Sequence, residues 1–310
     1  MCASPNAAGR YPRFVAVADD LEPRCAEVIR GAVGAVTLLR ALSVVVGLLF
    51  VASCGPSAAA SESSVRTIDV GGVSRTFRLY VPENLSGPAP LVVVLHGGFG
   101  SGAQAERAYG WDDEADAGGF VVAYPDGLNR AWNTGGGCCG VPERTNVDDI
   151  GFLSQVVAAV EHEVPIDARR RYVTGMSNGA VMAYTLACRT SLFAGIGPVA
   201  GTQLGECSSP QPLSVIHHHG TADANITYDG TPGRGVARID GPSVPDLNAT
   251  WRSIDGCAPP VVTSVGAATT SVAECPGGRS VELVTIAGGG HAWPPGATHT
   301  IWQFFAAHPR

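Results

Sequence analysis

The chain of 310 residues is 45% hydrophobic and 15% charged, which is typical of a globular protein with enough chain to bury a large core. Its net charge is −7 and its 20 basic residues are scattered, which argues against a nucleic-acid groove and a nucleic-acid partner. All of these basic residues are arginine, so the absence of lysine excludes a P-loop and lysine Schiff-base chemistry.

An apolar run over residues 41–53 follows Arg40 and ends at Cys54. The run is too short to span a bilayer comfortably, and it matches the hydrophobic region of a signal peptide. Its last residues, Val-Ala-Ser-Cys, resemble the lipobox of bacterial lipoproteins, in which the cysteine becomes the lipidated N-terminus. We therefore predict a signal region over residues 1–53 and lipidation of Cys54, with ordinary secretory cleavage near Cys54 as the alternative.

The segments on either side of this run are expected to lie outside the fold. Residues 1–27 carry four acidic side chains, which is unlike a basic signal start and indicates an over-extended reading frame that begins near Val28 or Val36. Residues 54–65 are small and polar and predict a flexible tether. Residues 66–310 then form one catalytic domain, without an internal repeat.

Within that domain, predicted strands alternate with predicted helices. The strands are residues 76–81, 91–95, 120–124, 171–174, 194–200, 213–217 and 281–286, and the helices are residues 149–163, 178–187 and 244–254. Several strands are continuous apolar runs, as strands buried on both faces should be. This alternation predicts an α/β fold with a mostly parallel central sheet and helices on both faces.

Nine cysteines support export to an oxidising compartment. Six of them remain when Cys2, Cys25 and Cys54 are set aside, which allows up to three disulfides. We expect local bridges between Cys188 and Cys207 and between Cys257 and Cys275. The adjacent Cys138 and Cys139 leave three alternatives open: a bond to each other, two free thiols, or links elsewhere.

Residues 175–179, Gly-Met-Ser-Asn-Gly, fit the pattern G-x-S-x-G. A predicted strand enters this segment and a predicted helix leaves it, which is the setting of a nucleophile elbow in α/β-hydrolases. The glycines permit the tight turn, and Ser177 would stand at a helix N-terminus, where free N–H groups favour negative charge. We predict that Ser177 is the nucleophile.

A nucleophilic serine needs a base and a residue that orients it, in the order Ser, Asp, His along such a chain. Asp223 and His291 each follow the end of a predicted strand, and we predict that they complete a triad with Ser177. Asp229, in the same loop as Asp223, is the main competitor for the carboxylate. Asp246 and Asp255 belong to a predicted helix and its exit, where we expect solvated side chains.

The run His217-His218-His219 suggests a metal only weakly, because consecutive strand residues point to opposite faces. No Cys-x-x-Cys spacing supports zinc either. We therefore expect no metal and no cofactor, and we expect His219 to support the loop of Asp223.

Two loops complete the predicted site. Backbone N–H groups of Gly98 (or Phe99) and Asn178 are expected to form the oxyanion hole. The long loop 129–146 places Trp132 beside Asn133, and we predict that these two and Trp293 border the substrate pocket. The alternative is that both tryptophans are core residues.

Several motifs together resemble the family of poly(3-hydroxybutyrate) depolymerases and feruloyl-esterase-type proteins of carbohydrate esterase family one, and within it the LpqC-like lipoprotein esterases. They are LHGG, YPDG, WN followed by CCG, NVDDIGFL, VTGMSNGA, HGTAD and GGGHAWP. The resemblance covers about residues 66–310, and it implies an α/β-hydrolase fold and an extracellular serine esterase whose triad is Ser177, Asp223 and His291. One departure is Asn-Ile-Thr-Tyr after the Asp223 loop, where the family often has Val-Pro-Tyr.

From the residues and the resemblance together we predict an exported carboxylic-ester hydrolase. It would be a monomer anchored to the cell membrane by lipid, or secreted, and its partner would be an ester substrate: a small molecule, a polyester or an esterified polysaccharide. The alternatives are an acyltransferase of the cell envelope on the same scaffold and a non-catalytic binding lipoprotein.

Overall fold

A computed structural model describes residues 63–83, 85–208, 210–235 and 238–310, and these residues belong to one compact unit. The predicted signal region 1–53, the lipidation site Cys54 and the predicted tether up to residue 62 lie outside the described residues. In the described part of the chain, no helix combines the length and apolar character needed to cross a membrane.

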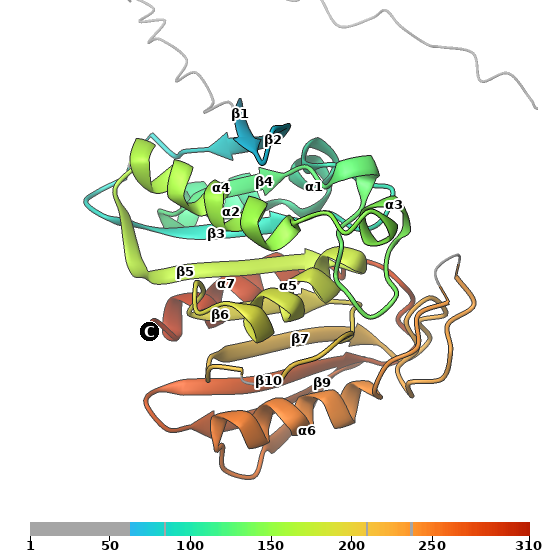
Figure 1. The fold of residues 1–310 in the computed structure, drawn as a ribbon. Helices are drawn as coiled ribbons and strands as arrows, with labels where there is room; N and C mark the ends of the chain where they lie inside the picture. Colours follow the sequence, from blue (N-terminus) through green and yellow to red (C-terminus); the bar gives the residue numbers. More distant parts are fainter. Residues whose placement is uncertain (1–62, 84, 209, 236–237) are drawn as a thin grey trace, which may run out of the picture. The chain divides into compact units, whose positions relative to one another are not determined.

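The described residues form a 10-stranded sheet in the order β1-β2-β4-β3-β5-β6-β7-β10-β9-β8 (Figure 1). The central strands β4, β3, β5, β6, β7 and β10 run parallel to one another, and antiparallel strands complete both edges. The strands are β1 (Ser64–Val70), β2 (Val73–Tyr80), β3 (Ala89–Leu95), β4 (Val121–Pro125), β5 (Ile166–Met176), β6 (Gly195–Val199), β7 (Ser214–Gly220), β8 (Val261–Val265), β9 (Ala268–Cys275) and β10 (Arg279–Ile286).

Helices cover both faces of the sheet, which confirms the predicted fold class. They are α1 (Gly102–Tyr109), α2 (Trp111–Gly118), α3 (Gly140–Arg144), α4 (Asp149–Glu163), α5 (Asn178–Arg189), α6 (Val244–Asp255), α7 (Ala297–Ala307) and the 3-10 turn η1 (Leu128–Arg130). Apolar residues of α4, α5 and α6 pack into one core, and those of α1, α2 and α7 pack into a second core on the opposite face (Figure 1). Because both faces are covered, every residue of β3, β4, β6 and β7 is buried.

Some elements lie outside the predicted set. Strand β1 begins at Ser64, inside the predicted tether. The hairpin of β8 and β9 was not predicted; β8 (VVTSV) is exposed along its whole length, so its three valines do not pack into a core. Helices α1 and α2 have only 8 residues each and meet at Gly110, whose left-handed backbone (φ 69°) separates them.

Three disulfides lie in the described part of the chain. Cys188 pairs with Cys207, and Cys257 pairs with Cys275, which are the two predicted local bridges. The third joins the adjacent residues Cys138 and Cys139, which selects one of the alternatives that the sequence left open. This last bridge lies immediately before α3, next to the site described below.

Candidate active site

The turn between β5 and α5 carries Ser177 in a strained backbone conformation. Its φ is 55° and its ψ is −120°, a combination that residues with a side chain rarely adopt. The flanking glycines allow it: a Cβ on Gly175 would lie 2.8 Å from the carbonyl carbon of Gly179, and one on Gly179 would overlap the Leu95 carbonyl oxygen. The Ser177 N–H donates to the Val199 carbonyl (2.9 Å), which fastens the turn to β6.

Asp223 and His291 meet at the ends of two neighbouring strands. Strand β7 leads into the loop of Asp223, and β10, which runs parallel to β7, leads into the loop of His291. Two hydrogen bonds join these loops: the Thr221 N–H donates to the Ile286 carbonyl (2.9 Å), and the Ala222 N–H donates to the Gly289 carbonyl (2.8 Å). The parallel pairing therefore brings together two residues that are far apart in sequence.

The Asp223 carboxylate is buried and hydrogen-bonded at both oxygens. Its Oδ2 lies 2.8 Å from Nδ1 of His291, and its Oδ1 accepts the N–H groups of Asn225 (2.8 Å) and Ile226 (3.0 Å). Burial alone would raise the pKa of this carboxyl, but these hydrogen bonds and the nearby His291 outweigh burial and hold the pKa of Asp223 below its ordinary value. An ionised Asp223 therefore accepts a hydrogen bond from Nδ1–H of His291, which leaves Nε2 as the ring nitrogen free for another partner.

A chain of buried side chains supports the Asp223 loop from behind. His219 Nε2 lies 2.8 Å from the Ile226 carbonyl and 3.5 Å from Asp223 Oδ2. His219 Nδ1 lies 3.0 Å from His217 Nε2, and His217 Nδ1 lies 2.9 Å from the Tyr184 hydroxyl. Burial lowers the pKa of both imidazoles, so each is neutral. Each therefore donates a hydrogen bond at one ring nitrogen and accepts one at the other.

The competing carboxylates lie elsewhere. Asp229 is exposed and accepts hydrogen bonds from Thr231, and Asp246 is exposed in the first turn of α6. Our expectation of a solvated Asp255 was wrong: it is 3% exposed and pairs with Arg279 at 2.8 Å. Among the described residues, no group of three or more His, Cys, Asp and Glu side chains is arranged to hold a metal ion.

The loop after β3 packs against the Ser177 turn. A Cβ on Gly98 would lie 3.9 Å from the Asn178 Cβ. The Phe99 N–H is already engaged, because it donates to the Arg130 carbonyl (2.7 Å). The Gly98 N–H donates to no acceptor within the described ranges, and Asn178 is the first residue of α5, whose N–H lacks an intrahelical partner. The geometry therefore favours Gly98 over Phe99 as the second donor beside Asn178.

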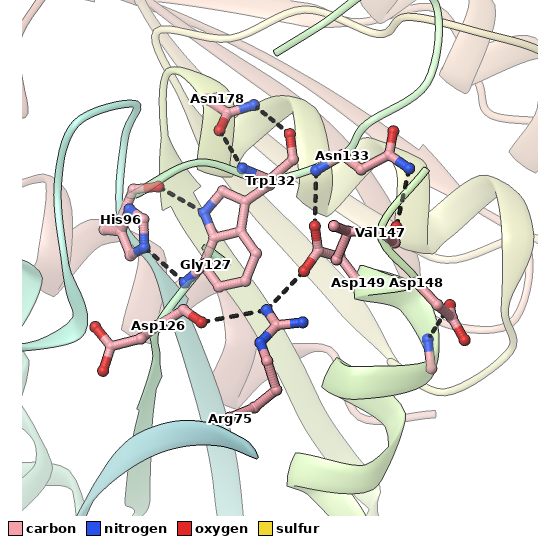
Figure 2. Close-up of polar contacts among 11 residues, drawn as sticks. Arg75, His96, Asp126, Gly127, Trp132, Asn133, Val147, Asp148, Asp149 and Asn178 are labelled. Carbon is pink, nitrogen blue, oxygen red and sulfur yellow. Dashed lines mark hydrogen bonds and ion pairs between the residues drawn. The ribbon is translucent and has the colours of Figure 1, made fainter. Parts of the chain in front are cut away.

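Trp132 lies in the core and does not line the pocket, contrary to our prediction. It is 0% exposed, and its indole N–H donates to the His96 carbonyl (2.8 Å). The side-chain amide of Asn178 forms two hydrogen bonds with the backbone of Trp132. Its Oδ1 accepts the Trp132 N–H (2.7 Å), and its Nδ2 donates to the Trp132 carbonyl (3.2 Å) (Figure 2). The buried His96 holds the same loop, because its Nε2 accepts the Gly127 N–H (2.9 Å).

Asn133 also holds its loop in place through hydrogen bonds, and it does not line the cavity, contrary to our prediction. Its backbone N–H donates to Asp149 Oδ2 (2.7 Å), and its side-chain Nδ2 donates to the Val147 carbonyl (2.9 Å) (Figure 2). Asp149 in turn pairs with the buried Arg75 at 2.7 Å. Sequence reasoning missed the roles of Arg75, His96 and the Asn178 side chain, although His96 lies in the LHGG motif and Asp149 in the NVDDIGFL motif.

Trp293, the predicted opposite wall, packs against α1 and α2. Its ring stacks on Tyr109 with centroids 4.3 Å apart, and it lies edge-on to Trp111. Its indole N–H donates to the Thr298 hydroxyl (3.0 Å). A tryptophan whose ring and N–H are both occupied by the protein is a packing residue, so the prediction for Trp293 was wrong.

A cavity of about 670 Å³ opens over the Ser177 turn. Its lining combines the predicted reactive residues with apolar side chains and two arginines. The lining residues are Gly98, Phe99, Asn129, Arg130, Ala131, Cys139, Gly140, Val141, Arg144, Ser177, Asn178, Asn225, Ile226, Gly235, Ile239 and His291. Ser177, His291, Gly98 and Asn178 thus line one space, and acyl transfer needs a nucleophile, a base and oxyanion donors in such a space.

Comparison with known proteins agrees with this geometry. The family described as esterase PHB depolymerase matches residues 75–238. NocK of Nocardia uniformis subsp. tsuyamanensis, which is named as an esterase, is 29% identical over 268 residues, covering 76% of this chain and 75% of that protein. Feruloyl esterase C of Emericella nidulans is 28% identical over 253 residues, covering 75% and 84%. The structure of acetyl xylan esterase from Aspergillus awamori superposes with a TM-score of 0.61 at 17% identity, covering 78% and 99%, which is a likeness of fold.

Proposed function

Because the chain belongs to the esterase PHB depolymerase family and is a carboxylic ester hydrolase, we propose that it works through Ser177, His291 and Asp223. The observation that carries this proposal is the 2.8 Å contact between Asp223 and His291, whose ring faces the same cavity as the strained Ser177. This arrangement supplies a nucleophile, its base and the group that orients the base.

In the proposed reaction, Ser177 Oγ attacks the carbonyl carbon of the ester while His291 Nε2 takes the hydroxyl proton. The carbonyl oxygen becomes negative, and the N–H groups of Gly98 and Asn178 stabilise it. The ester C–O bond then breaks, and the leaving alcohol takes the proton from His291. Water then attacks the acyl-enzyme while His291 Nε2 takes a proton from it. The bond between Ser177 Oγ and the acyl carbon breaks as His291 returns that proton to Oγ, which releases the acid and restores Ser177.

Throughout this cycle Asp223 stays ionised. Its pKa lies below the ordinary value, so it remains a carboxylate at neutral pH and stabilises the imidazolium that forms on His291. The neutral His219 behind it donates to the Ile226 carbonyl and so fixes the loop that presents the Asp223 oxygens. The carboxylate orients the base and does not itself receive the proton.

The relatives suggest the kind of ester. Their names include feruloyl esterase C and acetyl xylan esterase, so an acyl group on a plant polysaccharide is one candidate substrate, and a hydroxyalkanoate polyester is another. Apolar side chains of Phe99, Val141, Ile226 and Ile239 line the cavity, which suits an alkyl or aromatic acyl group.

We further propose that the protein is exported and monomeric and acts at the cell surface, held there by lipid on Cys54. The three disulfides support an oxidising compartment. Mass spectrometry of the mature protein tests the anchor: an acylated Cys54 at the N-terminus is expected, and an unmodified N-terminus near residue 54 would show ordinary secretion.

The decisive experiment on activity is Ser177→Ala. This variant should lose about 10⁴-fold or more in hydrolysis of a nitrophenyl ester, because the three residues act as a unit, while its circular dichroism spectrum stays unchanged. Ser264→Ala is the matched control, since Ser264 lies on the exposed hairpin of β8 and β9. Near-normal turnover by Ser177→Ala would overturn the proposed mechanism.

A further inference from the structure

The cavity over Ser177 is positively charged although the chain as a whole is negative. Its lining includes Arg130 and Arg144 and no aspartate or glutamate, whereas the net charge of the chain is −7. Glu143, the acid nearest to Arg144 in sequence, is not among the lining residues. A substrate that enters this space therefore meets two guanidinium groups and no opposing carboxylate.

Neither guanidinium is neutralised by the protein. Within the described ranges Arg130 and Arg144 form no ion pair, and the one side-chain hydrogen bond of Arg130 runs from Nε to the Gly100 carbonyl (3.3 Å). Other arginines do pair with carboxylates: Arg66, Arg75, Arg78, Arg169, Arg170, Arg171 and Arg279. Arg130 and Arg144 thus have no carboxylate partner among the described residues, and both line the cavity, where a ligand can supply one.

The backbone that carries Arg130 is held in an uncommon conformation. Asn129 and Arg130 are both left-handed, with φ of 49° and 61°, a conformation that residues with a side chain adopt only where their surroundings hold it. The Arg130 carbonyl accepts the Phe99 N–H (2.7 Å), directly beside Gly98. The turn of Arg130 is therefore fastened to the predicted oxyanion loop.

Arg144 is placed by the short helix α3. This helix starts directly after the Cys138–Cys139 bridge. Its end is closed by hydrogen bonds from the Thr145 N–H to the Val141 carbonyl (3.0 Å) and from the Val147 N–H to the Pro142 carbonyl (2.9 Å). Arg144 is exposed in the last turn of this helix and faces the cavity with Val141.

We propose that this enzyme prefers esters that carry a free carboxylate, which Arg130 and Arg144 bind while Ser177 attacks the ester carbon. The inference rests on the proposed function, and it narrows the substrate to an anionic ester with an apolar body. Guanidinium groups match a carboxylate in shape and charge and donate two parallel hydrogen bonds to it. The carboxylate belongs either to the acyl part, as in a hemiester of a dicarboxylic acid, or to the alcohol part, as in an ester of an acidic sugar.

Two matched pairs of substrates distinguish these sources. The acyl-side pair is the mono-4-nitrophenyl ester of glutaric acid and 4-nitrophenyl pentanoate. The alcohol-side pair is 4-acetoxybenzoate and 4-acetoxybenzamide. In at least one pair, kcat/KM should be about tenfold higher for the charged ester, as expected for hydrogen bonds to a charged group that are weakened by solvent. Added NaCl should reduce this preference, because salt screens charges at an open cavity.

Substitution then assigns the preference to the two arginines. Arg130→Gln and Arg144→Gln should each lower the charged-to-neutral ratio of kcat/KM several-fold, and the double variant should bring it close to one. Arg107→Gln is the matched control, because Arg107 is exposed on α1 outside the cavity and its loss changes the net charge by the same amount. Thermal melting checks that each variant is folded.

The outcomes separate this inference from the function on which it rests. Equal kcat/KM within both pairs, or a preference that both substitutions leave intact, would overturn the anionic substrate while the esterase stands. If no ester is cleaved, the proposed function fails. Calorimetric titration of Ser177→Ala with the hemiester and with its neutral counterpart then decides the binding preference without turnover, and equal affinities would overturn it.

Discussion

Two buried aspartates flank the Ser177 turn and differ in their partners. Asp149 is 1% exposed and Asp223 is 4% exposed, and both have each oxygen hydrogen-bonded. Asp149 accepts from Arg75 and from the Asn133 N–H, at 2.7 Å each. Asp223 accepts from two backbone N–H groups and bonds His291 at 2.8 Å.

The partner decides what each carboxylate does. Arg75 is a buried guanidinium, and its pair with Asp149 anchors the loop of Trp132 and Asn133 (Figure 2). His291 is partly exposed in the cavity, and its imidazole has two ring nitrogens, so Nδ1 can bond Asp223 while Nε2 accepts a proton from a substrate or a hydroxyl. Burial and full hydrogen bonding are therefore common to a structural and a proposed catalytic aspartate.

Asp223 and Asp149 should differ most in their effect on turnover. Asp223→Asn should lower kcat by about 10⁴, because an amide in this position favours the wrong tautomer of His291. Asp149→Asn should keep most of its turnover per folded molecule, since Asp149 touches no reacting group. The measurement is steady-state hydrolysis normalised to the folded fraction; an equally large loss at Asp149 would show that the two carboxylates are not separable in this way.

The second prediction concerns stability, where we expect substitution of the structural carboxylate Asp149 to have a large effect. Asp149→Asn should lower the free energy of unfolding by about 3–5 kcal/mol, because it leaves the Arg75 guanidinium buried without a counter-charge. Glu163→Gln breaks the partly exposed pair with Arg66 and should cost only about 0–1 kcal/mol. Urea unfolding compares the two variants, and similar small losses would mean that the buried pair does not anchor the loop.

The smallest expected change in stability concerns Glu282, a carboxylate with no cationic or imidazole partner among the described residues. Burial raises the pKa of Glu282, on β10, to about 7. Folded Glu282 therefore keeps its proton between the ordinary pKa of 4.5 and about 7, where the unfolded chain has already lost it. By linkage, this group makes stability fall as the pH rises through that window.

Glu282→Gln should consequently raise the Tm at pH 8 and change it little near pH 4.5. Differential scanning calorimetry at the two pH values measures the difference. Glu83→Gln, at an exposed position outside the sheet, is the control and should show no such trend. An equal gain at both pH values would mean that Glu282 acts through packing and not through its proton.

The sequence predicted well what local patterns encode. The strands β3 and β4 are continuous apolar runs, and the glycines around Ser177 mark a turn whose close packing only glycine allows. Asp223 and His291 follow predictable strands, so the parallel sheet places them side by side without further information. The fold class and the relative placement of Asp223 and His291 therefore follow from the pattern of apolar residues and from the order of strands and helices along the chain.

The pocket walls could not be predicted because they depend on contacts between distant residues. Trp132 was assigned to the pocket from its chemistry, yet the Asn178 amide and the His96 carbonyl hold it in the core. Arg75 and Asp149 are 74 residues apart in sequence, and nothing local signals their pairing. The cavity is instead lined by Arg130 and Arg144, whose position depends on left-handed turns and a short helix.

The strained backbone of Ser177 means that selection for thermal stability and selection for activity favour different residues at this position. A left-handed φ of 55° suits glycine, so replacing this serine by glycine would relieve strain of about 1–3 kcal/mol. A search for variants that survive heat would thus reward loss of the one hydroxyl on which the proposed chemistry depends. Directed evolution of this scaffold has to screen for turnover alongside thermal survival, or the most robust descendants will be inactive.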